Sequence, residues 1–323
     1  MNIPIKKDGY DPFIDYLKGV SILFVVLTHC LPKQEYLLFS LWGAQAVPLF
    51  LLIQVFHAYK KGIDHVRLFF NLKKLFHRIL KPFIFLLTIE VGVLLLYGHD
   101  LVSVVKDAII AGGIGPGSYY VWIYIQFFFL LPIVAVIIRR LNRFWCFFGF
   151  TLLCVMVEII CSYVHPHPAI YRLLFIRYIY LIYLGYLWVS WGIVINKLTV
   201  FLSILSIAFI LLFVYGDLNL EPLFYSNAWA LCHWITYFYT AYLFIYLLFF
   251  IYSLLGKHLK SFCFELGRYS YEIFLLQMFV FAFFPSLDFI GNKYVEVLLR
   301  IVLTTVLSIF PVLLYKKYVA IKQ

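Results

Sequence analysis

Three ionisable side chains inside long apolar stretches have the chemistry of an acid–base centre. His29 lies near the end of the first apolar stretch, Glu90 lies in the third and Glu158 in the fifth. An imidazole that is oriented by a carboxylate can remove a proton from a hydroxyl group and turn its oxygen into a nucleophile. A histidine between apolar helices can also be a packing residue, and the pattern alone leaves both interpretations open.

Amide, guanidinium and aromatic side chains in the same kind of stretch could complete such a centre. Gln126, Arg177 and Gln277 could donate hydrogen bonds to the negative charge that develops during proton removal and attack. Tyr120 and Trp122 could stack on a sugar ring, although aromatic residues near helix ends also form interfacial belts.

Cations form a second polar centre around residues 73–81. Lys73, Lys74 and Arg78 precede the third apolar stretch, where basic residues commonly set topology or contact lipid head groups. The alternative is a site for a phosphorylated cytosolic compound, with Arg78 as the best candidate because its planar fork can hold phosphate through two hydrogen bonds. Two centres on opposite faces would suit a donor on one side and an acceptor on the other.

The composition shows which elements must position these groups. Of 323 residues, 65% are hydrophobic and only 13% are charged, and the mean hydropathy is +0.97. A soluble fold needs more polar surface than this, so we predict a polytopic membrane protein. The net charge of +11 comes from cations in short stretches between apolar runs, which orient the chain in the bilayer and do not indicate a nucleic-acid partner.

The apolar stretches predict an all-α transmembrane helix bundle of about ten helices, since about 20 helical residues cross a bilayer. The expected spans are 13–31, 41–59, 79–97, 119–138, 144–163, 173–191, 198–215, 229–252, 268–285 and 297–315. This number of spans places most of the lysines and arginines on the side of both chain ends. The positive-inside rule therefore predicts cytoplasmic amino and carboxyl ends in a multi-pass protein of the inner (plasma) membrane.

Depth in the membrane limits the partners of His29. It lies about 21 Å from Asp15 along the first helix, so the two side chains cannot form a hydrogen-bonded pair. A carboxylate partner must come from another helix at a similar depth, and Glu158 fits best, followed by Glu90.

The sequence does not indicate a metal site or a glycine-rich phosphate-binding loop. The six cysteines show no paired spacing, and His165 and His167 are too few ligands for a metal. We therefore expect no metal. The glycine-rich run 112–118 follows no strand and is predicted to be a flexible loop.

Several short stretches, in order along the chain, resemble one family of integral membrane enzymes. They share small residues, an Asp–His separation, basic residues and aromatic pairs, and they are 14–19, 24–29, 46–50, 78–83, 115–120, 184–186 and 266–271. In these features the chain is similar to the acyltransferase-3 family, whose members move acetyl or other acyl groups onto sugars. The resemblance implies one transmembrane acyltransferase domain over residues 1–323.

The resemblance also implies roles for individual residues. His29 would be the catalytic histidine, and Arg78 would help to hold a cytosolic acyl donor, expected to be acyl-CoA. Two positions depart from the family pattern: Gln54-Val55 stands where a Ser-Gly pair is frequent, and Gln277 where a histidine is frequent.

The expected activity is O-acylation, most simply O-acetylation, of a polysaccharide or other surface or exported glycan of the cell envelope. A glycan or lipid-linked sugar would be the acceptor, and membrane lipids would surround the protein. An exporter of polysaccharide or lipid-linked sugar, without covalent chemistry, is the alternative that the same interior polar groups would serve.

Overall fold

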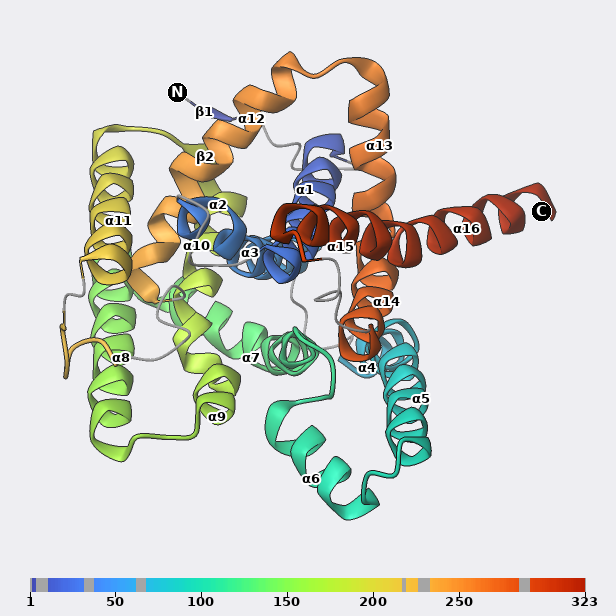
Figure 1. Cartoon of the computed structure of the whole chain (residues 1–323). Coiled ribbons are helices and arrows are strands. Elements are labelled where there is room, and N and C mark those ends of the chain that lie inside the picture. The colour runs from blue at the N-terminus through green and yellow to red at the C-terminus, as the bar shows by residue number, and fades with distance from the viewer. Residues whose placement is uncertain are drawn as a thin grey trace.

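The protein is an α-helical bundle in a computed structural model that describes residues 2–3, 11–31, 38–61, 68–216, 219–225, 233–284 and 291–322. The two strands in this part, β1 (Asn2–Ile3) and β2 (Ile193–Val194), form one short antiparallel pair. The predicted all-α fold class is therefore confirmed (Figure 1).

The helices follow one another along the whole chain. Those of the first half are α1 (Pro12–Cys30), α2 (Phe39–Trp42), the 3-10 turn η1 (Gly43–Gln45), α3 (Ala46–Lys60), α4 (Leu68–Leu75), the π-helical η3 (Phe76–Leu80), α5 (Lys81–Leu96), α6 (Leu101–Ala111), α7 (Tyr119–Arg140) and α8 (Arg143–Val164). Those of the second half are α9 (Pro168–Leu173), η4 (Phe175–Tyr178), α10 (Ile179–Trp191), α11 (Lys197–Tyr215), η5 (Trp234–Thr236), η6 (Tyr239–Phe244), α12 (Ile245–Leu254), α13 (Lys257–Arg268), α14 (Ser270–Phe283), α15 (Lys293–Ser308) and α16 (Phe310–Lys322).

Local sequence signals start several of these helices. The Asp11 side chain accepts a hydrogen bond from the Phe13 N–H before α1, and Asn142 does the same for Trp145 at the start of α8. Asn196 opens α11 with a capping box. Each cap satisfies a backbone donor that the first helical turn leaves without an intrahelical partner.

Every predicted span coincides with helical structure over its described residues, but the number ten is approximate. Residues 229–232 and 285 of the predicted spans lie outside the described part of the chain. In the described residues, seven helices are long and apolar enough to cross a membrane, and the apolar helices at 197–213 and 270–283 are shorter. The predicted span 173–191 is divided among the end of α9, η4 and α10. The structure also contains α6 and α13, which the apolar pattern did not predict.

Three glycines set the closest helix contacts. A Cβ atom on Gly19 would lie 2.0 Å from the Cys263 backbone carbonyl oxygen, and a Cβ atom on Gly267 would lie 1.8 Å from the Asp15 backbone carbonyl oxygen. The backbones of α1 and α13 are therefore in contact. A Cβ on Gly185 of α10 would approach a Val55 side-chain carbon of α3 within 2.5 Å. These glycines come from stretches that carry the family resemblance, and they act there as small residues that let membrane helices approach.

The helices are arranged around α1 and α3, and α16 extends away from the bundle (Figure 1). α8 and α11 lie on one side, and α5, α13 and α14 lie on the other. The outer faces of α5 and α8 expose large apolar side chains such as Phe85 (68%) and Leu152 (61%). A water-facing surface would not carry such faces, which suit contact with lipid.

Candidate active site

Helix α14 packs against both α5 and α1, and the predicted topology makes all three cross the membrane in the same direction. Near its start, the Tyr271 hydroxyl donates a hydrogen bond of 2.7 Å to the carbonyl oxygen of Ile79. Near its end, the Phe281 ring lies 5.1 Å from the His29 ring, centroid to centroid. The family-implied histidine therefore lies at the carboxyl end of α14.

The same two contacts place Glu90 at the level of His29. Glu90 follows Ile79 by eleven residues and Phe281 follows Tyr271 by ten, which corresponds to about 16 Å and 15 Å of helix. His29 lies one turn after Val25 in α1, and Glu90 lies one turn after Leu86 in α5. Val25 and Leu86 belong to the same apolar cluster. Glu90 of α5 and His29 of α1 thus lie at similar heights, on two helices that both pack against α14.

Two buried polar side chains in this region lack hydrogen-bond partners within the described part of the chain. Glu90 and Gln277 are each 0% exposed, and neither oxygen of Glu90, nor the amide oxygen or nitrogen of Gln277, is hydrogen-bonded to a described residue. Such groups are costly inside a membrane protein, where they mark sites of ligands, water or catalysis. We call His29, Glu90 and Gln277 the α14 site.

Arg78 lies near the opposite end of α14, one residue before the Ile79 contact. Its side chain is exposed. Among the tyrosines of this region, Tyr120 of α7 lies 6.4 Å from Tyr124 and 5.5 Å from Phe274 of α14, centroid to centroid, and Phe274 lies 6.4 Å from Tyr271. The sequence indicated Arg78 and Tyr120, whereas Tyr124 and Tyr271 were missed because tyrosines are abundant in this chain.

Other predicted residues border this end of α14. Lys73 and Lys74 are exposed on α4. The Gln54 amide, at a position that departs from the family pattern, donates a hydrogen bond of 3.1 Å to the carbonyl oxygen of Tyr124. It therefore joins α3 to α7 beside the tyrosines.

The glycine-rich run 112–118 packs against α14 and is not the loosely held loop that the sequence predicts. Gly112, Gly113 and Gly115 are buried, and a Cβ on Gly115 would lie 2.7 Å from the Met278 carbonyl oxygen. Gly113 has a φ of +131°, which a side chain would strain. The glycines are therefore needed for close packing between this run and α14.

Trp122 is tied to this run while leaving part of its surface free. Its indole N–H donates a hydrogen bond of 2.8 Å to the Gly112 carbonyl oxygen, and 41% of the residue is exposed. The exposed part is available for stacking.

Glu158 lies in a separate group, the Glu158 cluster, formed by Glu158, Tyr171, Arg177, Tyr225 and His233. One carboxylate oxygen accepts hydrogen bonds from the Tyr171 hydroxyl (2.7 Å) and the Tyr225 backbone N–H (3.2 Å). The other oxygen lies 3.3 Å from His233 Nδ1 and 3.8 Å from Arg177 Nε. Within the described residues, both oxygens of Glu158 are thus engaged by groups other than His29.

Arg177 and Gln126 also contact this part of the bundle. Arg177 is 2% exposed, and its guanidinium carbon lies 3.7 Å from the centre of the Tyr171 ring. The Gln126 amide donates a hydrogen bond of 3.2 Å to the carbonyl oxygen of Leu173, where α9 ends. Of the predicted donors to the reaction, only Gln277 lies on the helix that contacts His29.

In the described residues, no group of three or more histidine, cysteine or acidic side chains is placed to hold a metal ion. Five cysteines, Cys30, Cys146, Cys154, Cys161 and Cys263, are buried and free.

An apolar helix bundle with glutamate and amide side chains buried inside it is typical of a polytopic membrane protein with an internal functional site. A family model described as an acyltransferase domain matches residues 11–316, nearly the whole chain. The chain therefore belongs to the acyltransferase-3 family and is a membrane acyltransferase. No curated protein and no solved structure matches it.

Proposed function

We propose that the protein transfers an acyl group, most simply acetyl, from cytosolic acyl-CoA to a hydroxyl of a surface or exported glycan. The observation that carries this proposal is the α14 site. Two buried polar side chains lack described partners, Gln277 on α14, the helix that contacts His29, and Glu90 on the neighbouring α5, and Arg78 lies at the other end of α14.

In the proposed reaction, His29 removes the proton from the acceptor hydroxyl as its oxygen attacks the thioester carbonyl carbon. A carbon–oxygen bond forms, the carbon–sulfur bond breaks, and the proton passes from His29 to the departing thiolate. Glu90 orients the imidazole, and Gln277 donates a hydrogen bond to the oxyanion. Glu90 suits this role better than Glu158, whose oxygens already have partners.

The donor would enter at the Arg78 end of α14. Arg78, with Lys73 and Lys74 on α4, offers positive charge to the phosphate groups of CoA. The extended pantetheine arm could then follow α14 over the roughly 15 Å that separate Tyr271 from Phe281. This route would bring the thioester to His29.

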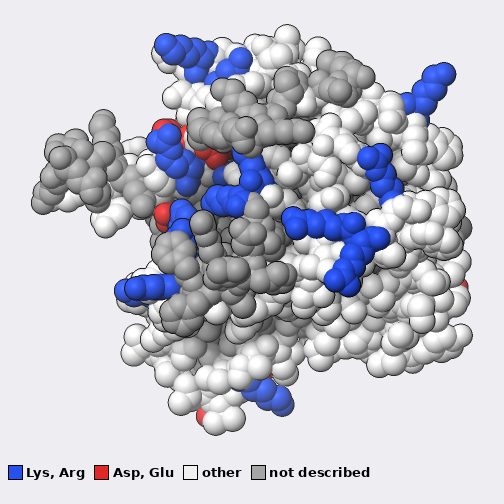
Figure 2. Space-filling view, turned by 180° about the vertical axis from the view of Figure 1, so that it is seen from behind, with Lys and Arg blue, Asp and Glu red and all other residues white. Residues whose placement is uncertain are grey.

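The distribution of charged side chains indicates which face of the protein is cytoplasmic. Lys and Arg side chains gather across the middle of one face, with few acidic side chains among them (Figure 2). By the positive-inside rule, this favours a cytoplasmic location for that face. The proposed protein is one domain over residues 1–323 in the inner membrane, with both chain ends on the cytoplasmic side. The acceptor, a glycan or lipid-linked sugar, would approach from the other side and stack on Trp122, since Tyr120 lies toward the Arg78 end of α14.

The test is acyl transfer by the purified protein in lipid nanodiscs, with labelled acetyl-CoA and glycan from cells that lack the gene. His29→Ala should lower kcat by about 10²–10⁴-fold. The matched control is His258→Ala, a change of an exposed histidine on α13, which should leave the rate unchanged. Equal rates for wild type and His29→Ala would refute the mechanism.

An exporter remains the second candidate, since buried polar groups without partners also suit a conduit. In liposomes, glycan movement without release of CoA would favour export. Release of CoA in proportion to acylated glycan would favour the transferase.

A further inference from the structure

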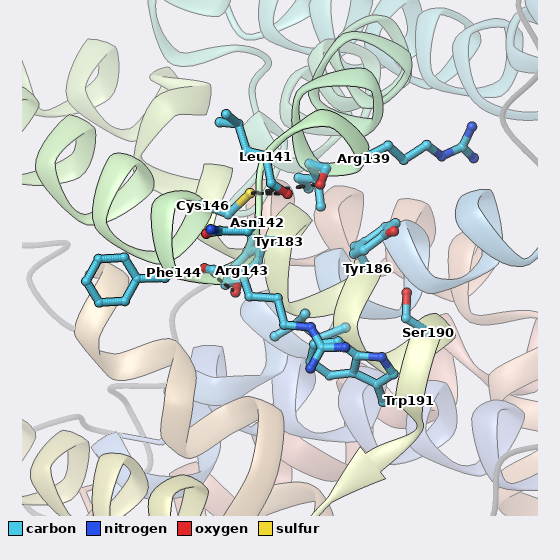
Figure 3. Close-up of a pocket in the computed structure, with 12 residues that line it drawn as sticks. Arg139, Leu141, Asn142, Arg143, Phe144, Cys146, Tyr183, Tyr186, Ser190 and Trp191 are labelled. Carbon is cyan, nitrogen blue, oxygen red and sulfur yellow. Dashed lines mark hydrogen bonds between the residues drawn. The ribbon is translucent and has the colours of Figure 1, made fainter.

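A cavity of about 610 Å³ lies away from the α14 site, where α7 ends, α8 begins and α10 ends. Its polar lining comes from Arg139, Asn142, Arg143, Tyr186, Ser190 and Trp191. In Figure 3, Arg143 lies along Trp191, and the Tyr186 and Ser190 hydroxyls lie on a neighbouring wall.

The lining is positively charged. It includes two arginines and no acidic residue, and within the described residues neither arginine forms an ion pair. The Arg143 guanidinium carbon lies 2.9 Å from the centre of the Trp191 ring, and the Tyr183 hydroxyl donates a hydrogen bond of 3.3 Å to the Arg143 carbonyl oxygen. A cation held against an aromatic ring keeps its N–H groups available and loses little entropy on binding an anion.

The rim of the cavity is apolar and exposed. Phe144 is 60% exposed and Trp191 is 39% exposed, and both stand beside the basic segment 139–143. Aromatic and basic residues at one helix end are typical of the membrane–water interface. The cavity therefore offers a cationic base and an apolar mouth to the same ligand.

We propose that this cavity binds the phosphate group of an anionic amphiphile at the membrane surface. Arg143 would hold the phosphate oxygens, Tyr186 and Ser190 would donate hydrogen bonds, and the apolar part would lie along Phe144 and Trp191. An anionic phospholipid and the CoA thioester of the proposed reaction both carry this chemistry, and the experiment distinguishes them.

The experiment measures bound lipid by native mass spectrometry after exchange into nanodiscs of phosphatidylcholine with or without phosphatidylglycerol. Arg143→Gln should weaken phosphatidylglycerol retention about tenfold, because it removes a charge-assisted, two-pronged contact. The matched control is Arg140→Gln, a change of a neighbouring exposed arginine outside the lining, which should retain lipid as wild type does.

Because Arg143 also packs on Trp191, Tyr186→Phe provides a second variant that removes only a hydroxyl and should weaken retention by a smaller factor. Displacement of bound phosphatidylglycerol by soluble CoA would assign the cavity to the donor. Retention in excess CoA would assign it to lipid. Equal retention by wild type, Arg143→Gln and Tyr186→Phe, or no preference for phosphatidylglycerol over phosphatidylcholine and no CoA binding, would overturn the proposal.

Discussion

Two buried glutamates in this bundle have opposite surroundings. Glu158 is 2% exposed and uses both oxygens on Tyr171, Tyr225, His233 and Arg177. Glu90 is 0% exposed, and neither of its oxygens has a hydrogen-bond partner within the described residues. A carboxylate whose oxygens are engaged holds helices together, whereas one whose oxygens are not engaged suits a substrate or a catalytic partner.

The largest expected effect is on stability at the Glu158 cluster. Glu158→Gln leaves Arg177 without its buried countercharge, so we expect a loss of about 3–5 kcal/mol in the free energy of unfolding. Thermal unfolding of the purified protein in detergent would measure it. Glu90→Gln is the matched control and should melt within a few degrees of wild type. A common melting temperature for both variants would remove the distinction between the two glutamates.

Glu90→Gln should instead affect catalysis. Losing the carboxylate that orients His29 should lower kcat about tenfold or more, with KM for acyl-CoA unchanged because Arg78 still holds the donor. Steady-state release of CoA in nanodiscs would separate the two constants. A rise in KM at constant kcat would place Glu90 in donor binding and not beside the histidine.

Gln277→Leu should stabilise the folded protein and slow acyl transfer. The buried amide has no described partner, so replacing it with an apolar side chain of similar size should raise the free energy of unfolding by about 1 kcal/mol. Acyl transfer should fall because the oxyanion loses a donor. Thermal unfolding and the acylation rate, measured on one preparation, test the expected gain in stability and the expected loss of activity. A destabilised variant would mean that the amide has a partner after all.

Gln126→Leu is the same substitution at an engaged amide and should have the smallest effect. It removes the hydrogen bond to the Leu173 carbonyl oxygen, which should cost about 0.5–1.5 kcal/mol. Acyl transfer should stay at the wild-type rate. A large loss of activity with intact stability would return Gln126 to the reaction that the sequence predicted for it.

The sequence by itself determined the membrane bundle, its approximate spans and the family, because hydropathy and short motifs are local properties of the chain. It also identified His29, Glu90, Glu158 and Gln277 as candidate functional residues, since each is a polar residue in an apolar stretch.

Only the tertiary structure decided which of these groups meet. The sequence favoured Glu158 as the partner of His29 because both lie near the same predicted membrane face. In the structure, Glu158 contacts Arg177 and His233, while His29 and Glu90 lie at similar heights on two helices that both pack against α14. Depth can be counted along one helix, but the rotation of each helix and its choice of neighbours depend on packing between segments far apart in the chain.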